Sequence, residues 1–329
     1  MLVTVIRPMA ILIAEFCQNH NGDRAVIKEM IAAAHASGAT YAKIQTIFSE
    51  DLTRRERFED GKTHADGTVA TLKRPFLTEQ DRLRPMDLTP DDYAWFIEEC
   101  GRVGIKPLTT VFTLGRVADM AKLGWKDVKV ASYDCASLVL LKQLKHYFSH
   151  LFISTGATHD WEVARTAHLL RDHSFSFLHC VTVYPTPLPE LHLRRMRYLR
   201  QYTPSVGFSD HTLIARDGIK ASLMALAMGA EVIERHFTVL PPEQTKDGPV
   251  SITPAHLQEL VTFAKLPVHE RLQIVKDTIP EWRQTMGYEQ RDLSPTELLN
   301  RDYYRGRFAT HTRSPVWNWD AMDDDGTNA

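Results

Sequence analysis

Two lysines interrupt short runs of residues that otherwise resemble buried strands. Lys43 and Lys129 each stand between two apolar residues in a β-rich run. A buried ammonium without a partner is costly, so these side chains either have partners or serve a function. Inward lysines beside serine and threonine hydroxyls are typical of a site that binds an anion.

Two histidines and a glutamate could supply chemistry beside such an anion site. His211 and His236 end two consecutive β-rich runs, and a pair of imidazoles suits a divalent transition metal with oxygen ligands. The alternative is a pair of core histidines with satisfied hydrogen bonds. Glu234 shares a strand face with His236, and Glu15 could act as a general acid or base. These residues suggest a metal-dependent enzyme acting on an anionic, phosphorylated substrate.

The elements that must position these residues alternate regularly along the chain. The strand candidates are residues 10–15, 40–46, 106–111, 128–131, 151–155, 176–181, 205–209 and 231–235. The helix candidates are residues 25–37, 90–103, 114–123, 137–148, 159–172, 187–201, 212–228 and 254–265. Eight successive β-then-α units predict an α/β fold, a (β/α)₈ TIM barrel with a short C-terminal extension. An open, doubly wound sheet is the alternative, because periodicity does not distinguish the two.

Polar side chains lie at the predicted carboxyl ends of these strands. In a parallel barrel those ends open onto one mouth, where the chemistry takes place. The candidates at or just beyond the strand ends are Glu15, Lys43, Gln45, Thr110, Lys129, Ser132, Asp134, Ser154, Tyr184, Ser209, His211 and His236. Stability alone does not explain so many polar strand ends.

Two regions break the alternation of strands and helices. Residues 47–88 form a long, charged connection after the second strand, which we expect to lie over the mouth as a lid. The segment after Pro267 is polar and ends in acidic residues. We therefore divide the chain into a TIM-barrel domain, residues 1–266, and a C-terminal arm and tail, residues 267–329. Beyond Ser314 we expect a frayed tail.

Composition narrows the function classes further. A net charge of −2 with intermixed signs argues against nucleic acid or an anionic membrane as the main partner. No apolar run reaches ~18 residues, so we expect no transmembrane helix. The four cysteines are far apart without a Cys-x-x-Cys motif, which favours a reduced, cytoplasmic setting and buried cysteines that fill space. Dinucleotide-binding, nucleophile-elbow and His-Glu-x-x-His motifs are absent from the sequence.

The polar strand ends also carry long motifs. Residues 13–23, with the sequence Ile-Ala-Glu-Phe-Cys-Gln-Asn-His-Asn-Gly-Asp, closely resemble the opening motif of the sialic acid synthase (N-acetylneuraminate synthase) family. The resemblance continues in chain order through residues 42–46, 129–132, 153–156, 178–187, 206–212 and 233–238. It covers about residues 11–265, with a fainter match over 300–308.

The resemblance implies a reaction and a role for each residue. Such enzymes condense phosphoenolpyruvate with an amino-hexose aldehyde, release phosphate and usually use Mn²⁺, with Mg²⁺ or Co²⁺ as alternatives. By the matching motifs, His211 and His236 would hold the metal, and Glu15 would move a proton at the attacking water. The implied phosphoenolpyruvate contacts are Lys43, Lys129, Ser132, Ser154 and Ser209, with Thr110 near the phosphate. The implied sugar contacts are Gln45, Tyr184 and Asp247, and Asp134 occupies a position that is often acidic.

The departures from the family pattern concern the acceptor end of the site. Cys17 stands where the family usually has Gly, and residues 245–251 replace a Gly-Pro-Asp motif while keeping Asp247. The resemblance also implies a C-terminal antifreeze-like domain that lends an Arg to the partner's sugar site, and we expect no such domain here. The acceptor can therefore differ from N-acetylmannosamine. We expect the lid and the arm to bind it, and the arm to pack on a neighbouring subunit in a homodimer.

Two alternatives stay open at this point. One is a synthase of the 3-deoxy-octulosonate or heptulosonate phosphate type, whose phosphorylated acceptor would need a second basic cluster such as Arg54–Arg57. The other is a catalytically silent relative that serves as a binding subunit, although Glu15 and the paired lysines and histidines argue against it.

Overall fold

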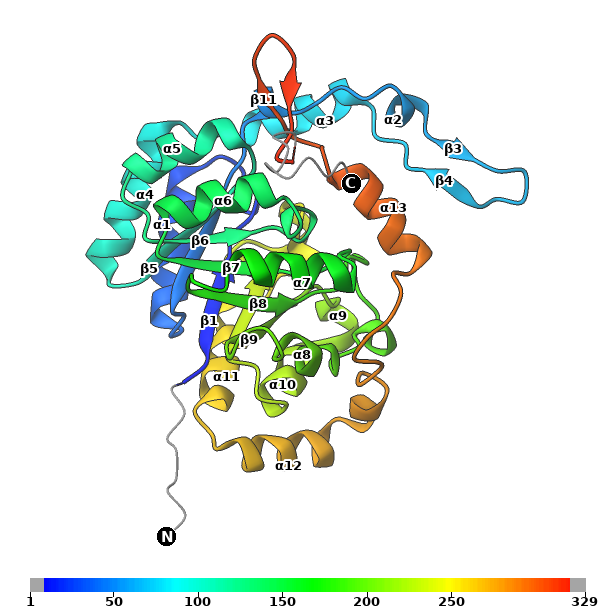
Figure 1. The fold of residues 1–329 in the computed structure, drawn as a ribbon. Helices are drawn as coiled ribbons and strands as arrows, with labels where there is room; N and C mark the ends of the chain where they lie inside the picture. Colours follow the sequence, from blue (N-terminus) through cyan, green and yellow to red (C-terminus); the bar gives the residue numbers. More distant parts are fainter. Residues whose placement is uncertain (1–8, 320–329) are drawn as a thin grey trace.

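Eight parallel strands close into a barrel in the computed structural model, which describes residues 9–319 (Figure 1). Around the barrel the strands follow chain order: β1 (Ile11–Glu15), β2 (Tyr41–Thr46), β5 (Lys106–Val111), β6 (Asp127–Val130), β7 (His150–Ser154), β8 (Phe175–His179), β9 (Val206–Asp210) and β10 (Val232–His236). β10 pairs with β1 and completes the closure. The predicted (β/α)₈ barrel is confirmed, and the doubly wound sheet is wrong.

Helices surround the barrel as the alternation predicted, with two differences. They are α1 (Arg24–Ala36), α4 (Pro90–Val103), α5 (Leu114–Lys122), α6 (Leu138–Tyr147), α7 (Asp160–Leu169), α8 (Arg195–Leu199), α9 (Ile214–Asp217), α10 (Lys220–Ala227) and α11 (Pro254–Ala264). The helix predicted over 187–201 is reduced to the short α8, since its first part, with two prolines, forms a 3₁₀ turn at Leu188–Glu190. The helix predicted over 212–228 is divided at Gly218, whose φ of 55° is left-handed.

The inside of the barrel is apolar below and polar above. One core cluster inside the barrel consists of Ile13, Tyr41, Leu108, Phe152, Leu178 and Val232. Residues two apart in a strand share a face, so several of these are followed by an inward polar residue: Ile13 by Glu15, Tyr41 by Lys43, and Val232 by Glu234. The cluster closes the floor of the barrel, and the polar residues lie above it toward the carboxyl ends of the strands.

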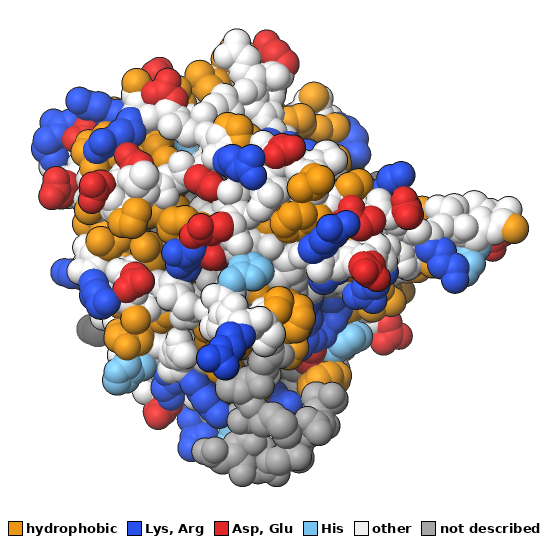
Figure 2. Space-filling view, turned by 90° about the horizontal axis from the view of Figure 1, so that it is seen from above, with side chains coloured by type: hydrophobic (Ala, Val, Ile, Leu, Met, Phe, Trp, Pro, Cys, Tyr) orange, Lys and Arg blue, Asp and Glu red, His pale blue; other side chains and the backbone are white. Residues whose placement is uncertain are grey.

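The long connection after β2 contains structure of its own. It comprises η1 (Ser49–Asp51), α2 (Arg57–Asp60), β3 (Lys62–Thr63), β4 (Val69–Thr71), α3 (Phe76–Leu83) and η2 (Arg84–Met86). The β3–β4 hairpin extends away from the barrel at the right of Figure 1, whereas α3 lies nearer to it. Figure 2 views the molecule from above and shows acidic, basic and apolar side chains intermixed on that face. That face therefore presents no broad surface of one charge.

The C-terminal arm runs along the outside of the barrel. It contains α12 (Val268–Thr278), η7 (Pro280–Arg283), α13 (Pro295–Tyr304), β11 (Thr310–His311) and β12 (Pro315–Val316). α12 packs on α10, and α13 lies at the other end, near the lid (Figure 1). Among residues 9–319, no helix combines the length and apolar character that crossing a membrane requires. The division at residue 266 stays a prediction.

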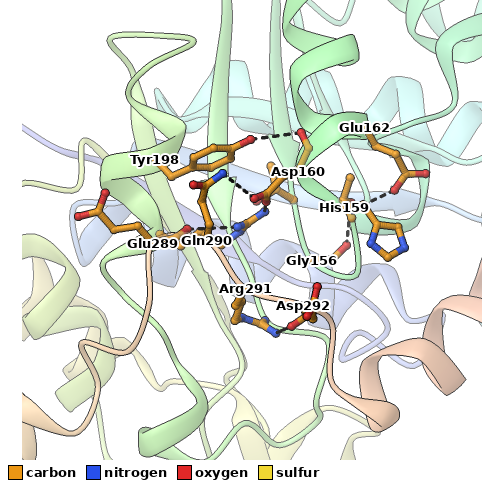
Figure 3. Close-up of polar contacts among 12 residues, drawn as sticks. Gly156, His159, Asp160, Glu162, Tyr198, Glu289, Gln290, Arg291 and Asp292 are labelled. Carbon is orange, nitrogen blue, oxygen red and sulfur yellow. Dashed lines mark hydrogen bonds and ion pairs between the residues drawn. The ribbon is translucent and has the colours of Figure 1, made fainter.

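Ion pairs and hydrogen bonds hold the arm on the barrel of its own chain. Asp160 at the start of α7 accepts from Arg195 at 2.6 Å and from Gln290 of the arm at 3.0 Å (Figure 3). Arg301 of α13 pairs with Glu162 of α7 at 2.5 Å. These contacts place α13 beside the barrel mouth without a second subunit.

The expectation of a frayed tail beyond Ser314 is wrong for residues up to 319. Asn318 is 3% exposed, and its amide donates to the carbonyl of Phe112 at 2.9 Å and to Asp134 Oδ1 at 2.8 Å. The backbone carbonyl of Asn318 accepts from the N–H of Leu140 at 3.2 Å. A buried residue with two side-chain hydrogen bonds and one backbone hydrogen bond is held in place. The acidic end of the predicted tail lies outside the described residues.

Candidate active site at the barrel mouth

One cavity of about 620 Å³ at the carboxyl ends of the strands is lined by all thirteen residues predicted for the site. These are Glu15, Lys43, Gln45, Thr110, Lys129, Ser132, Asp134, Ser154, Tyr184, Ser209, His211, His236 and Asp247. The strands bring them together by register: Glu15 lies beside Lys43 on one side and His236 on the other, and Thr110 beside Lys129. The structure thus assembles the whole predicted set in one place.

Two lysines and two glutamates form a buried charged quartet in the middle of the cavity. Lys43 is ion-paired with Glu15, and its ammonium lies 3.4 Å from Glu234 Oε1. Lys129 lies 3.3 Å from Glu234 Oε2. All four residues are at most 5% exposed. Each buried charge therefore has an opposite charge beside it, as burial requires.

Serine hydroxyls complete the quartet. Ser209 donates to Glu234 Oε2 at 2.7 Å, and Lys129 donates to the hydroxyl of Ser154 at 2.6 Å. Lys129 also donates to the carbonyl of Val130 at 3.0 Å. Ammonium and hydroxyl groups of this kind can instead donate their hydrogen bonds to the oxygens of an anionic ligand.

Charge coupling keeps the carboxylate of Glu234 ionised at neutral pH. Burial lowers the pKa of Lys43 to about 8, with Glu234 opposing the shift and Lys129 adding to it. Burial raises the pKa of Glu234, but Lys129, Lys43 and Ser209 outweigh it and bring the pKa to about 2. The carboxylate between the lysines is therefore charged throughout the physiological range.

Glu234 was not among the predicted site residues, although the sequence already indicated that it lies on the same strand face as His236. The signal that could have identified it is electrostatic: two inward lysines at one barrel mouth need a buried acid between them. Glu234 is the carboxylate that both ammonium groups share, since Lys43 contacts one of its oxygens and Lys129 the other.

Two imidazoles lie side by side at the edge of the quartet. The ring centroids of His211 and His236 are 5.3 Å apart. Burial lowers the pKa of both, to about 3 for His211, where the neighbouring His236 adds to the effect. Both rings are therefore neutral at physiological pH, the form that binds a metal ion. Nδ1 of His236 is buried and has no hydrogen-bond partner among the described residues.

Asp247 is held beside these rings despite the altered sequence around it. Its Oδ2 lies 4.0 Å from His236 Nδ1, and its Oδ1 accepts from the hydroxyl of Tyr184 at 2.6 Å. The backbone N–H of Asp247 donates to Asn19 at 3.3 Å, and its carbonyl accepts from Ser251 at 2.7 Å. These bonds fix the loop 245–251 so that the carboxylate enters the cavity.

Cys17 is a further potential ligand that sequence reasoning treated as a space-filling residue. Its sulfur, a ring nitrogen of His236 and a carboxylate oxygen of Asp247 all lie within 4.8 Å of one another, and all three residues are buried. A thiol, an imidazole and a carboxylate are a suitable donor set for a divalent transition metal. These three groups can hold one ion at the edge of the quartet, and the ring of His211 lies beside that of His236 but is not one of the three clustered donors.

Asp134 lines the cavity through a hydrogen-bonded carboxylate. It accepts from Ser137 at 2.9 Å and from Asn318 at 2.8 Å, and burial raises its pKa. Its contacts are structural, and they connect the strand-borne part of the site to the arm.

The lid and the arm close the outer part of the cavity. From the lid come Arg74 and Arg82, and from the arm come Asn300, Tyr304, Arg307 and Asn318. Sequence reasoning named both segments as candidates for this role but did not identify most of these residues. Their approach depends on docking between segments that are far apart in the chain.

Comparisons with known proteins agree with this geometry. The model of the NeuB family matches residues 30–269. The N,N'-diacetyllegionaminic acid synthase of Campylobacter jejuni is 30% identical over 260 residues, which cover 77% of this chain and 74% of that protein. The human N-acetylneuraminate-9-phosphate synthase is 29% identical over 266 residues, covering 78% and 69% of the two chains.

A solved structure supports the fold. The N-acetylneuraminic acid synthetase of Leptospira borgpetersenii, crystallised with citrate, superposes with a TM-score of 0.67 at 24% identity, covering 90% of this chain and 91% of that one. The sequence motifs, the barrel and the family match lead to one conclusion: this chain belongs to the NeuB family of sugar-acid synthases.

Proposed function

We propose that the chain condenses phosphoenolpyruvate with an aldose to give a sialic-acid-type 3-deoxy-2-ulosonic acid and inorganic phosphate. Family membership supports the reaction class. The observation that carries the proposal is the pair of buried lysines beside serine hydroxyls at the barrel mouth. This arrangement suits a small, multiply charged anion.

The quartet and its serines bind phosphoenolpyruvate in this proposal. Lys43, Lys129, Ser154 and Ser209 take its carboxylate and phosphate, with Ser132 and Thr110 at the wall of the same cavity. Because the ammonium groups are already held by carboxylates, they are oriented before the substrate arrives. Such preorganisation reduces the entropic cost of binding.

The aldose lies across the rim, against Gln45, Tyr184 and Asp247. C3 of the enol attacks the aldehyde carbon and forms the new C–C bond. Water then adds at C2, and phosphate leaves with cleavage of its C–O bond. Glu15, ion-paired with Lys43, accepts one proton from that water and passes it to the former aldehyde oxygen, which becomes a hydroxyl. The second proton of the water leaves with the phosphate as the C2 hydroxyl becomes the ketone.

We further propose that His211 and His236 hold a divalent metal, most simply Mn²⁺, with Mg²⁺ or Co²⁺ as alternatives. The neutral rings and the unpartnered Nδ1 of His236 fit such an ion. An ion bound there would supply Lewis-acid polarisation of the aldehyde carbonyl. A homodimer and a cytoplasmic location also stay predictions.

The test is consumption of phosphoenolpyruvate with a panel of aldoses, with the keto-acid product identified by mass spectrometry. We expect turnover to stop after chelation and to return with Mn²⁺. A His211→Ala, His236→Ala double variant should lose both turnover and Mn²⁺ binding measured by electron paramagnetic resonance. A chain that consumes phosphoenolpyruvate with none of the aldoses would contradict the proposed reaction and favour a silent binding subunit.

A second candidate function, with a phosphorylated acceptor, is favoured by an arginine cluster at the rim. Arg82 and Arg307 both pair with the carboxylate of Glu79, at 3.2 and 2.9 Å. Burial raises the pKa of Glu79, but Arg82, Arg307 and the nearby Arg74 outweigh burial and lower it. Three guanidinium groups around one carboxylate leave excess positive charge. Nε of Arg82 and of Arg307 are buried without a partner among residues 9–319.

The basic cluster predicted at Arg54–Arg57 is wrong as an acceptor site. Arg54 pairs with Glu59, and Arg57 pairs with Asp302. Arg55 donates to backbone carbonyls of the arm. None of these arginines is among the described residues that line the cavity. Arg55 and Arg57 dock the lid on the arm, and Arg54 stays within the lid.

The two candidates differ in the acceptor that each requires. Neutral aldose, aldose 6-phosphate and the corresponding uronic acid are compared at fixed phosphoenolpyruvate. If the acceptor is anionic, Arg307→Gln should raise its KM about tenfold or more and leave the KM of phosphoenolpyruvate unchanged. Arg57→Gln is the matched control, since it removes a lid arginine outside the cavity. Equal efficiency with the neutral aldose would contradict the anionic acceptor while leaving the condensation intact.

A further inference from the structure

Cys17 occupies a place in the structure that differs from that of a core cysteine. Cys100 and Cys135 belong to the apolar cluster between strands and helices, whereas Cys17 belongs to none of the apolar clusters formed by the described residues. It lines the cavity directly after β1. Its burial therefore brings its sulfur among polar groups rather than among hydrocarbon.

The backbone holds Cys17 in a conformation that side chains rarely adopt. Its φ of 48° is left-handed, which disfavours a residue with a Cβ. Its N–H donates to Glu15 Oε1 at 2.6 Å, so the turn is fixed by the quartet. Strained non-glycine residues of this kind cluster at functional sites, where the surroundings determine their conformation.

The sulfur lies beside two other ligand atoms. Cys17, His236 and Asp247 each offer one donor atom, and these atoms lie within 4.8 Å of one another. An ion bound at about 2.0–2.3 Å separates its ligands by at most about 4.6 Å. Small side-chain adjustments therefore bring all three donors onto one ion.

The surroundings orient these donors. The hydroxyl of Tyr184 donates to Oδ1 of Asp247, so Oδ2 of the same carboxylate faces His236. Nδ1 of His236 has no other partner in the described part of the chain. Outer hydrogen bonds that orient a carboxylate are a regular feature of metal sites.

We propose that Cys17 is a thiolate ligand of the metal ion, so that the ion is held by Cys17, His236 and Asp247 with His211 beside them. This inference rests on the proposed metal site, and it assigns to that site a soft ligand beyond the histidine pair. Binding converts the thiol to a thiolate, and its proton passes to solvent. A thiolate favours Zn²⁺, Fe²⁺ and Co²⁺ over Mn²⁺ and Mg²⁺.

The test uses Co²⁺ as a spectroscopic probe on the full chain after chelation. A cysteine thiolate bound to Co²⁺ gives an intense near-ultraviolet charge-transfer band, which nitrogen and oxygen ligands do not give. We expect the band in the natural protein and its loss in Cys17→Ser. Cys100→Ala is the control, because it removes a buried thiol elsewhere and should keep the band.

Metal preference supplies a second readout that does not depend on activity. Cys17→Gly suits the left-handed backbone, so it should fold and keep the histidine pair. Competition between Zn²⁺ and Mn²⁺, measured by metal content after dialysis, should shift toward Mn²⁺ by tenfold or more in this variant. An unchanged preference, or a band that persists in Cys17→Ser, would overturn the inference.

Failure of this inference and failure of the proposed reaction are separable. A thiolate band in a protein that consumes no phosphoenolpyruvate supports the ligand and contradicts the reaction. Turnover in a protein that binds Co²⁺ without the band supports the reaction and overturns the ligand.

Discussion

Replacing Lys129 by Met tests the anion site directly. The change keeps much of the side-chain volume and removes one ammonium from the buried quartet. Lys129 makes three contacts: Glu234 at 3.3 Å, the hydroxyl of Ser154 at 2.6 Å and the carbonyl of Val130 at 3.0 Å. These three contacts match the three donors of an ammonium, so phosphoenolpyruvate must take over one of these positions.

The expected magnitude follows from the burial of this group. Lys129 is 3% exposed, so its interaction with a bound anion is little screened by water. Removing one partner of a buried charge pair costs ~3–5 kcal/mol. Each ~1.4 kcal/mol is a factor of ten. The dissociation constant of phosphoenolpyruvate should therefore rise roughly a hundredfold or more.

The assay is calorimetric titration with phosphoenolpyruvate in the absence of an acceptor, so that no turnover interferes. Lys126→Met is the matched control, because Lys126 is exposed just before the same strand and should leave affinity unchanged. Lys43→Met should bind as weakly as Lys129→Met and melt lower, since it also leaves Glu15 without its ion-pair partner. A folded Lys129→Met protein with unchanged affinity would refute the assignment of the anion site.

Three further predictions concern stability. Burial lowers the pKa of His179 to about 3, below its value in the unfolded chain. The stability that the neutral ring contributes is therefore complete above about pH 6.5 and is lost as the pH falls. Between about pH 7 and 5, the free energy of unfolding measured in urea should fall by about 2 kcal/mol less in His179→Gln than in the natural protein. Asn318→Ala removes amide bonds to a backbone carbonyl and a buried carboxylate, so thermal melting should reveal a loss of about 1–3 kcal/mol, whereas no change would mean that this contact is not formed. A Cβ at Gly207 would lie 2.3 Å from the carbonyl oxygen of Val232, so Gly207→Ala should lower the free energy of unfolding by about 1–3 kcal/mol or more. As a control, Gly101→Ala lies in open space on a helix and should raise it by about 0.5–1 kcal/mol.

The strand-borne half of the site could be predicted because its geometry is local. Within a strand, residues two apart share a face, so the position of Lys43 in its strand already determines that Tyr41 points the same way. Closure of the barrel then brings the strand ends together, whatever the details of the helices outside. The same reasoning shows why Glu234 could have been included, since it shares its face with His236.

The helices were less predictable where local geometry competes with apolar periodicity. The segment 187–201 has helical spacing, but its prolines favour a 3₁₀ turn, and only Arg195–Leu199 remains α-helical. The segment 212–228 is interrupted at Gly218 for a similar reason. In both places the barrel is unaffected, because the strands on either side keep their register.

The outer half of the site depends on contacts that no local pattern contains. Arg307 reaches Glu79 of the lid across 228 residues of sequence, and Asn318 reaches Asp134 across 184. Neither pairing follows from periodicity, because each depends on where the arm lies on the barrel. The arm is placed by Arg301 on Glu162 and by Gln290 on Asp160, both residues of the outer helix α7. Figure 3 shows the contact of Gln290 with Asp160.

The division between floor and rim has a chemical consequence. Groups on the strands, such as Lys129 and Glu234, are fixed by the barrel, so the proposed phosphoenolpyruvate site is tied to the fold. Groups on the lid and the arm, such as Arg82 and Arg307, are fixed by ion pairs between surface segments. Substitutions in those segments can change the acceptor without disturbing the barrel. Because the rim of the cavity is built by the lid and the arm, we expect the proposed acceptor choice to depend on these two segments.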